Sequence, residues 1–182
     1  MVFCLLGSDG AAMTRKHTRE TINVGQTAPS FTLQDVGGHR CSLADALGRG
    51  PVVATFFKIS CPVCQFTLPF LERLYKTYGG NRVSFWAISQ DDAEDTKDFC
   101  KEYGLTFPAL LDEDDYPVSN SYGLTNVPSY FLIAPDGKIE VASVGFGKRA
   151  QEKISESLAR FLGMPPTPLF LPGEIVPEAK PG

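Results

Sequence analysis

The stretch that decides the fold reads Pro51-Val-Val-Ala-Thr-Phe-Phe57-Lys-Ile-Ser-Cys61-Pro-Val-Cys64. Its first half, residues 51–57, is a continuous apolar run rich in β-branched and aromatic residues, which is typical of a strand covered on both faces of a sheet. From Pro62 the hydrophobic spacing becomes helical, and Gly79 with Gly80 ends the helix. The apolar positions of this helix are Cys64, Leu68, Leu71 and Tyr75. A buried strand that leads directly into an amphipathic helix predicts an α/β domain.

Strand and helix patterns continue to alternate after this stretch. Further strands are predicted at 82–88, 107–111, 127–133 and 139–144, and further helices at 91–103, 116–122 and 150–162. Asp91 and Asp92 offer caps for the first of these helices, and the acidic residues 112–115 predict helix-start charges and a solvated loop rather than a cation site. Pro135-Asp136-Gly137-Lys138 is a hairpin signal between the last two strands. The whole pattern predicts a mixed central sheet flanked by helices.

The composition is that of one ordinary soluble domain. The 182 residues are 43% hydrophobic and 21% charged, and the longest apolar runs are far shorter than a membrane span. A formal net charge of -4 provides no basic surface for phosphate backbones or anionic lipids. We therefore expect no nucleic-acid partner and no membrane partner.

Both ends of the chain differ from the region between them. Residues 1–22 predict a disordered leader, because the apolar run 2–6 is too short for a secretory signal and Gly7-Ser8-Asp9-Gly10 follows it. The expected location is therefore the cytoplasm by default. Met13 is an alternative translation start, and an incorrect start leaves an extracytoplasmic location open. Residues 164–182 are too rich in proline for a helix or a central strand, so they predict a tail that is solvated or laid along the domain of residues 23–163.

Chemistry is concentrated at Cys61 and Cys64, at the junction between the buried strand and the helix. The unpaired amides and the positive end of a helix favour a thiolate at this position. Cys61 is therefore predicted to attack, and Cys64, one turn later, to resolve the mixed disulfide. Pro62 suits the first helical turn, where its missing amide would have no partner.

Three other interpretations of this cysteine pair exist. A zinc site needs a second pair of ligands, and Cys4, Cys41, Cys100, His17 and His39 show no ligand spacing, so no metal is expected. A structural disulfide across so short a loop constrains the unfolded chain little. Cysteines that simply pack in the core are the remaining alternative, and this alternative is favoured for Cys100. Cys41 shows no evident partner.

Several motifs outside the pair carry a family resemblance. They are Val24-Gly-Gln-Thr-Ala-Pro-Ser-Phe-Thr-Leu33, Gly37-Gly38, Ser42-Leu43, the strand and cysteine pair quoted above, Asn126-Val127-Pro128 and Asp136-Gly137. With these motifs the chain resembles the thioredoxin superfamily from about residue 23 to 163. More narrowly, it resembles the redoxin group, which contains the TlpA/ResA-like thiol-disulfide oxidoreductases and the AhpC/TSA peroxiredoxins. The resemblance implies a thioredoxin-like fold with an N-terminal β extension and an inserted βα unit.

The resemblance also implies a substrate site. It places a cis peptide before Pro128 opposite the cysteine pair, in a loop that offers backbone groups to an extended substrate strand. Pro62, Val63, Val127 and Pro128 would then contact substrate. No cofactor is implied. Electrons would come from a dithiol donor protein, and the substrate would be a disulfide-containing protein or a small thiol compound.

The sequence departs from the family pattern around the cysteines. Lys58 and Ala54 stand where a peroxiredoxin carries threonine and proline. Thr55 and Thr67 stand where thioredoxins and the ResA-like branch, respectively, carry a buried carboxylate that accepts a proton. Ser60 replaces an aromatic residue. Lys58, Ser60 and Thr67 are therefore possible modulators of the reaction.

The predicted function is thiol-disulfide exchange at Cys61 and Cys64, with a role in cell redox homeostasis. One alternative is an atypical peroxiredoxin that uses the same pair, which the absent threonine disfavours and rapid thiol consumption by hydrogen peroxide would support. Another is a non-catalytic binding module that uses the loop at Pro128. Unchanged partner binding by a Cys61→Ser variant would favour the binding module.

Overall fold

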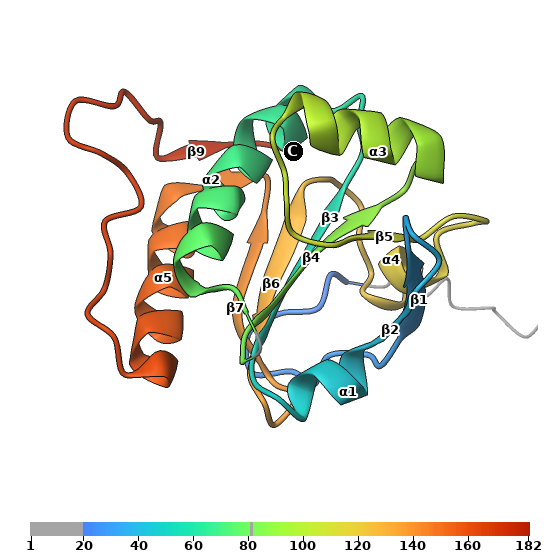
Figure 1. Ribbon diagram of the computed structural model, residues 1–182, viewed down its shortest axis with the longest axis horizontal. Coiled ribbons are helices and arrows are strands. Elements are labelled where there is room, and N and C mark those ends of the chain that lie inside the picture. The colour runs from blue at the N-terminus through green and yellow to red at the C-terminus, as the bar shows by residue number, and fades with distance from the viewer. Residues whose placement is uncertain (1–19, 81) are drawn as a thin grey trace, which may run out of the picture.

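The computed structural model describes residues 20–80 and 82–182, and its centre is a seven-stranded mixed sheet (Figure 1). The strand order is β2-β1-β5-β4-β3-β6-β7. These strands are β1 (Thr32–Asp35), β2 (Arg40–Ser42), β3 (Val52–Phe57), β4 (Ser84–Ser89), β5 (Ala109–Leu111), β6 (Ser129–Ile133) and β7 (Ile139–Val144). Because β3 pairs in parallel with β4 and antiparallel with β6, the sheet is mixed, as the sequence predicts.

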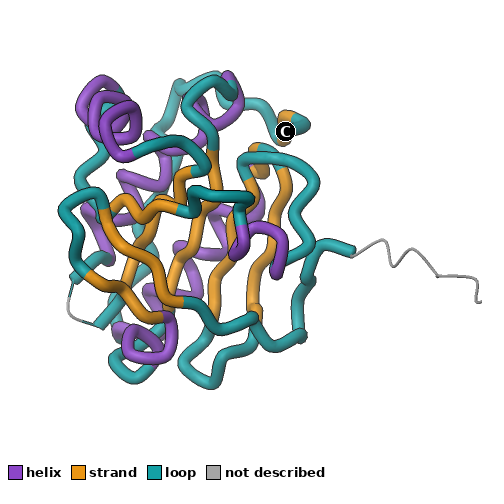
Figure 2. Tube along the Cα trace, turned by 90° about the vertical axis from the view of Figure 1, so that its right-hand side faces the viewer, coloured by secondary structure: helices purple, strands orange, loops and turns teal. Residues whose placement is uncertain are grey.

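Helices cover both faces of this sheet (Figure 2). They are α1 (Leu43–Leu47), α2 (Pro62–Tyr78), α3 (Ala93–Glu102), α4 (Pro117–Ser121) and α5 (Lys148–Leu162). Buried residues of α2, α3 and α5 share one hydrophobic cluster, and those of α1 and α4 belong to a second cluster. The predicted layer arrangement, a sheet between helices, is therefore confirmed.

The central strand β3 divides the two clusters. Val53 and Phe57 belong to the cluster that contains Cys64, whereas Val52, Ala54 and Phe56 belong to the other. All six residues of the strand are buried, which is why its sequence is apolar without alternation. The end of this strand is thereby fixed from both sides, and it carries the loop that leads to Cys61.

Some element boundaries differ from the sequence predictions. The predicted strand at 127–133 begins only at Ser129, since Pro128 has no amide to donate to a neighbouring strand. The predicted helix at 116–122 is shorter, because Tyr116 has a left-handed backbone with a φ of 53°. The N-terminal β extension is the hairpin of β1 and β2, and β1 joins the main sheet by antiparallel pairing with β5.

The proline-rich segment after α5 lies along the outside of the molecule, past α5 and α2 (Figure 1). Leu169 is buried against the cluster that contains Cys64, and Phe170 packs on it from outside. The segment ends in β9 (Ala179–Lys180), which pairs antiparallel with β8 (Phe146–Gly147). Within the described ranges, no helix is long and apolar enough to cross a bilayer.

Candidate active site

Cys61 is the N-cap residue of α2. Its backbone is extended, and its Sγ accepts a hydrogen bond from the amide of Cys64 at 3.3 Å. Pro62 follows in the first turn and is exposed, and Val63 is half-buried. The Cys61 sulfur therefore lies at the N-terminal end of α2, where the first backbone amides have no partner within the helix. This position stabilises a negative charge on a side chain.

The loop between β3 and Cys61 is held by hydrogen bonds from three directions. The amide of Cys61 donates to the carbonyl of Lys58 at 3.2 Å, which closes a turn. The Asp91 carboxylate accepts from the Ile59 amide at 2.8 Å, and the Gln65 side chain donates to the Ile59 carbonyl at 2.9 Å. The sequence pattern predicts helix caps at Asp91 and Asp92. The cap of α3 is Asp92, and Asp91 instead fixes the loop before Cys61.

The structure brings Val127 and Pro128 to Cys61. The half-buried Cys61 thiol lies 3.4 Å from the carbonyl oxygen of Val127, and the Val127–Pro128 peptide is cis, as the resemblance implied. Ser129 donates its hydroxyl to the Asn126 carbonyl at 2.7 Å, and Gly145 donates its amide to the Pro128 carbonyl at 2.7 Å. The loop around the cis peptide is therefore fixed on both sides of the proline.

The second cysteine of the pair has a different environment. Cys64 is fully buried in the cluster that also contains Phe57 and Leu68. Burial strongly raises the pKa of the Cys64 thiol; a hydrogen bond with the Lys58 backbone opposes this, and Cys61 and the Asp91 charge add to it. Cys64 is thus held as a neutral thiol behind the half-buried Cys61.

Three side chains named as possible modulators lie close to the pair. The Lys58 ammonium stands 5.2 Å from the ring centroid of Tyr116, and both residues line a cavity with Cys61. Ser60 is exposed. Thr67 is buried and donates its hydroxyl to the Val63 carbonyl of its own helix at 2.6 Å, so its one proton is already committed within α2.

Thr55 lies on the same face of β3 as Val53 and Phe57, the face that carries the cluster with Cys64. Its side chain is buried, and its Oγ1 has no hydrogen-bond partner within the described part of the chain. Burial of an unpaired hydroxyl is unfavourable. The position where the resemblance implies a carboxylate therefore carries a hydroxyl that no described residue pairs with.

A polar cavity of about 460 Å³ opens beside Cys61. Gln90 and Ser119 form part of its wall, and the Gln90 side chain donates to the Ser119 hydroxyl at 2.9 Å. Ser119 in turn donates its hydroxyl and its amide to the buried carboxylate of Asp112, both at 2.7 Å. The prediction of helix-start charge is confirmed for Asp112, which accepts amides of the first turn of α4 but is buried rather than solvated, and residues 113–115 form the exposed part of the loop.

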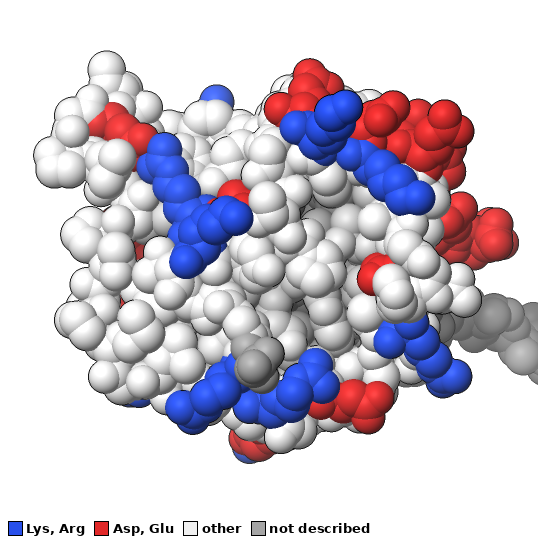
Figure 3. Space-filling view, viewed as in Figure 1, with Lys and Arg blue, Asp and Glu red and all other residues white. Residues whose placement is uncertain are grey.

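The flank of the site beside Ser60 is acidic. A shallow hollow there is lined by Asp95, Asp98 and Glu102 of α3. Figure 3 shows acidic side chains over this helix, with basic side chains between them.

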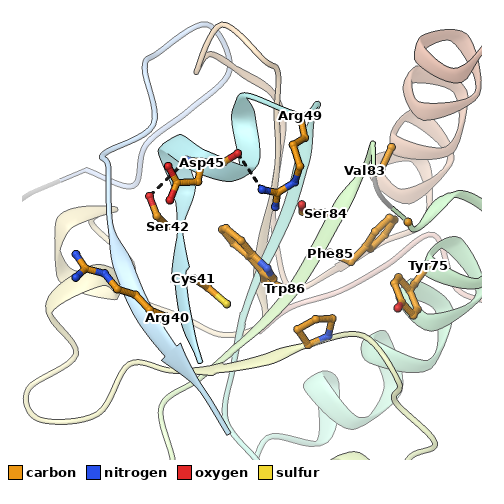
Figure 4. Close-up of a pocket in the computed structure, with 12 residues that line it drawn as sticks. Arg40, Cys41, Ser42, Asp45, Arg49, Tyr75, Val83, Ser84, Phe85 and Trp86 are labelled. Atoms are coloured by element: carbon orange, nitrogen blue, oxygen red, sulfur yellow. Dashed lines mark hydrogen bonds between the residues drawn. The ribbon is translucent and has the colours of Figure 1, made fainter. Parts of the chain in front are cut away.

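The other cysteines lie apart from the pair. Cys100 packs on the outside of the first cluster, and burial, with the charge of Glu72, raises its pKa to about 11. Cys41 lies in a separate cavity between β2, α1 and β4, together with Arg40 and Arg49 (Figure 4). Neither residue of the Cys61–Cys64 pair lines that cavity. Cys4 and His17 are outside the described residues.

Comparison with known proteins places these features in context. A model of the AhpC/TSA family matches residues 24–142. The thiol-disulfide oxidoreductase ResA of Geobacillus thermodenitrificans is 32% identical over 141 residues, which cover 77% of this chain and 79% of the relative. ResA of Bacillus subtilis is 34% identical over 122 residues, which cover 66% and 67%.

Solved structures share the fold. A putative thiol:disulfide interchange protein DsbE from Chlorobium tepidum has a TM-score of 0.68 and 24% identity, with 79% of this chain and 100% of that chain covered. Peroxidoxin BcpB from Mycobacterium tuberculosis has a TM-score of 0.64 and 23% identity, with 78% and 98% covered.

Proposed function

This chain belongs to the AhpC/TSA family and is a thiol-disulfide oxidoreductase of thioredoxin-like fold, and from that premise we propose that Cys61 attacks and Cys64 resolves. The observation that carries the assignment is the contrast between the two sulfurs. Cys61 is half-buried at the helix start, within 3.4 Å of Val127, whereas Cys64 is fully buried with a raised pKa. Only the first sulfur is open to a substrate that arrives from outside.

The exchange then proceeds in two balanced steps. The thiolate of Cys61 attacks one sulfur of the substrate disulfide, and the other substrate sulfur leaves as a thiolate. Cys64 next gives up its proton to solvent or to the leaving thiolate, and its sulfur attacks the Cys61 sulfur. This releases the second substrate thiolate and leaves a Cys61–Cys64 disulfide. Two electrons pass from the protein dithiol to the substrate, and a dithiol donor protein restores the reduced pair.

Substrate contacts are assigned to the surface around the two cysteines. The carbonyl of Val127 lies 3.4 Å from Cys61, and the exposed Pro62 and half-buried Val63 follow Cys61 in the helix, whereas Pro128 itself is buried and acts by shaping the loop. We expect an extended segment of a disulfide-containing protein to pair, as a strand does, with the main-chain groups of the loop at Val127. Small disulfides reach the same sulfur through the polar cavity.

The test is the reduction potential of the Cys61/Cys64 couple, read by thiol alkylation and intact mass across graded dithiothreitol or glutathione buffers. A two-electron transition near about −250 mV or lower marks a reductant, and one near about −120 mV marks an oxidant. We expect Cys61→Ser to abolish exchange and Cys64→Ser to trap a mixed disulfide on Cys61. Cys41→Ser and Cys100→Ser are the matched controls, and both should show the same two-electron redox transition as the wild type.

Absence of any Cys61–Cys64 disulfide under oxidising buffer would contradict the assignment. The same samples distinguish peroxide reduction, since an atypical peroxiredoxin would consume its thiols in hydrogen peroxide much faster than in an equimolar small disulfide.

A further inference from the structure

The proline-rich segment ends on the loop that borders Cys61. The Asn126 side chain donates to the Gly182 carbonyl at 3.1 Å. A Cβ atom added to Gly182 would lie 2.6 Å from the Val127 carbonyl oxygen, so the two backbones are in direct contact. Gly182 also lines the cavity beside Cys61. The chain's own residues therefore occupy part of the surface assigned above to substrate.

We call residues 178–182 the strap. The amide of Lys148 donates to the Glu178 carbonyl at 2.9 Å, and the next residues pair as β9 with β8. The Lys180 ammonium lies 4.2 Å from the ring centroid of Phe66, which is on α2 just after Cys64. Backbone pairing and a cation–π contact thus hold the strap along the start of α2.

At Gly145 the strap lies so close to the backbone beneath it that there is no room for a side chain. Gly145 has a φ of 74°, and a Cβ atom there would lie 2.2 Å from the backbone oxygen of Lys180. The amide of the same glycine donates to the Pro128 carbonyl. One residue therefore contacts both the strap and the loop at the cis peptide, so the strap is seated directly against the candidate substrate site.

Two further contacts hold the segment before the strap. Arg73 forms a bidentate ion pair with Glu174, at 2.7 and 2.8 Å. The Phe170 ring packs against Phe70 and Phe146, with ring centroids 5.2 and 6.3 Å away. Because the approach to the strap is fixed at these points, the strap can leave Val127 without the whole segment leaving the domain.

We propose, on the basis of the function proposed above, that the strap selects substrates by size. With the strap in place, the strand position beside Val127 is filled, and only compact disulfides reach Cys61, through the polar cavity. An extended polypeptide that carries a disulfide gains access after the strap separates from β8. The enzyme with the strap in place, the closed enzyme, therefore reacts with small-molecule disulfides. The open enzyme, in which the strap has separated from β8, also reacts with protein disulfides.

The test compares Lys180→Pro with Lys180→Arg in the full chain. Proline removes both the amide of the β8–β9 pair and the cation over Phe66, whereas arginine retains both. One readout is alkylation of Cys61, located by peptide mass spectrometry, with iodoacetamide and with a maleimide carried on a long polyethylene glycol chain. The second readout is turnover of glutathione disulfide and of insulin disulfides.

We expect Lys180→Pro to raise two rates by about fivefold or more: the alkylation of Cys61 by the polyethylene glycol maleimide, called the bulky-reagent rate below, and the turnover of insulin disulfides. A shift from a closed to an open population requires an increase in both. The iodoacetamide rate and glutathione disulfide turnover should stay within about twofold, and Lys180→Arg should match the wild type. Lys180→Glu, which removes the cation but keeps the amide, is a second variant with a smaller increase. Ile175→Ser, at a fully exposed position before the strap, is the inert control.

Equal bulky-reagent rates in wild type, Lys180→Pro and Lys180→Glu would overturn the proposal. A failure of the proposed function looks different: no variant would turn over glutathione disulfide or insulin, while the alkylation contrast would persist. The strap would then cover a thiol that does not perform exchange. An increase for both reagents alike in Lys180→Pro would indicate general loosening and would also overturn size selection.

Discussion

The Sγ atom of Cys61 lies 3.4 Å from the carbonyl oxygen of Val127, although the two residues are 66 positions apart in the chain. Antiparallel pairing of β3 with β6 produces this approach, because the last residues of β3 pair with the first residues of β6. The same sulfur accepts the amide of Cys64. Cys61 therefore contacts one main-chain acceptor and one main-chain donor, and both are fixed by the sheet and the helix rather than by mobile side chains.

The contrast between the two sulfurs predicts selective alkylation. In the reduced protein near neutral pH, iodoacetamide should modify Cys61 at least about tenfold faster than Cys64, because Cys64 is buried and its raised pKa keeps it as the thiol. Peptide mass spectrometry over a time course measures both rates. Unfolding in guanidinium is the control and should equalise them; equal rates in the folded protein would refute the assignment of roles.

The unpaired hydroxyl of Thr55 predicts a stabilising substitution. Thr55→Val replaces the hydroxyl by a methyl group of similar size, so it removes a buried polar group that has no partner. The free energy of unfolding should rise by about 1 kcal/mol, and the exchange rate should stay unchanged. Urea unfolding of the two proteins measures the difference. A loss of stability would show that the hydroxyl has a partner after all.

The companion variant Thr55→Asp tests proton transfer from Cys64. It adds a carboxylate to the face of β3 that carries the cluster with Cys64, where a base can accept the proton that Cys64 must lose. Turnover at neutral pH should increase, while the free energy of unfolding should fall by about 1–3 kcal/mol because a charged group is buried. Stopped-flow measurement of the resolving step checks the first expectation. An unchanged rate in a folded Thr55→Asp protein would mean that solvent already accepts this proton efficiently.

Asp91 predicts two separable effects. Burial is the main cause of the raised pKa of Cys64, and the Asp91 carboxylate charge adds to it, so Asp91→Asn should lower that pKa slightly, which the pH dependence of Cys64 alkylation in a Cys61→Ser background reports. The asparagine oxygen can still accept from the Ile59 amide, so the loop should remain in place. Asp91→Ala removes that acceptor as well and should cost about 1–3 kcal/mol of stability. If both variants leave the pH profile unmoved, the charge of Asp91 does not act on Cys64.

The Arg73–Glu174 pair predicts a pH-dependent attachment of the proline-rich segment. Hydrogen bonds from Arg73 and from the Leu171 amide lower the pKa of Glu174 from 4.5 to about 2. A lowered carboxyl pKa contributes stability that is complete above 4.5 and is lost as the pH falls toward 2. The Leu171 amide shift, followed by NMR, should move over this acid range only. Glu174→Gln should show no such transition; a transition of the same size in that variant would assign it to another group.

The sequence predicts the parts of this molecule that local patterns encode. The apolar run at Val52–Phe57, the helix that starts at Pro62 and the hairpin at Asp136-Gly137 all stand where spacing and turn chemistry put them. The position of Pro128 opposite Cys61 followed from the resemblance to a family, since no local pattern pairs those residues.

What the sequence does not predict depends on contacts between distant residues. Two adjacent carboxylates at the start of α3 look equivalent as caps, yet Asp92 caps the helix and Asp91 binds the loop before Cys61. Prolines exclude a helix after α5, but they do not indicate that Arg73 meets Glu174, 101 positions away. The acidic residues 112–115 look alike in the sequence, and no local pattern indicates that Asp112 is the carboxylate that is buried and accepts the Val118 amide.

The strand order has a consequence for synthesis of the chain. β3 lies between β4, which follows it after one helix, and β6, which emerges only after β4, α3, β5 and α4 have been made. One hydrogen-bonding edge of this fully buried strand therefore stays open on the ribosome until late. Open apolar edges pair readily with other chains, so a nascent chain truncated before Ser129 is expected to aggregate. Chaperone supply during this interval should therefore improve the yield of folded protein.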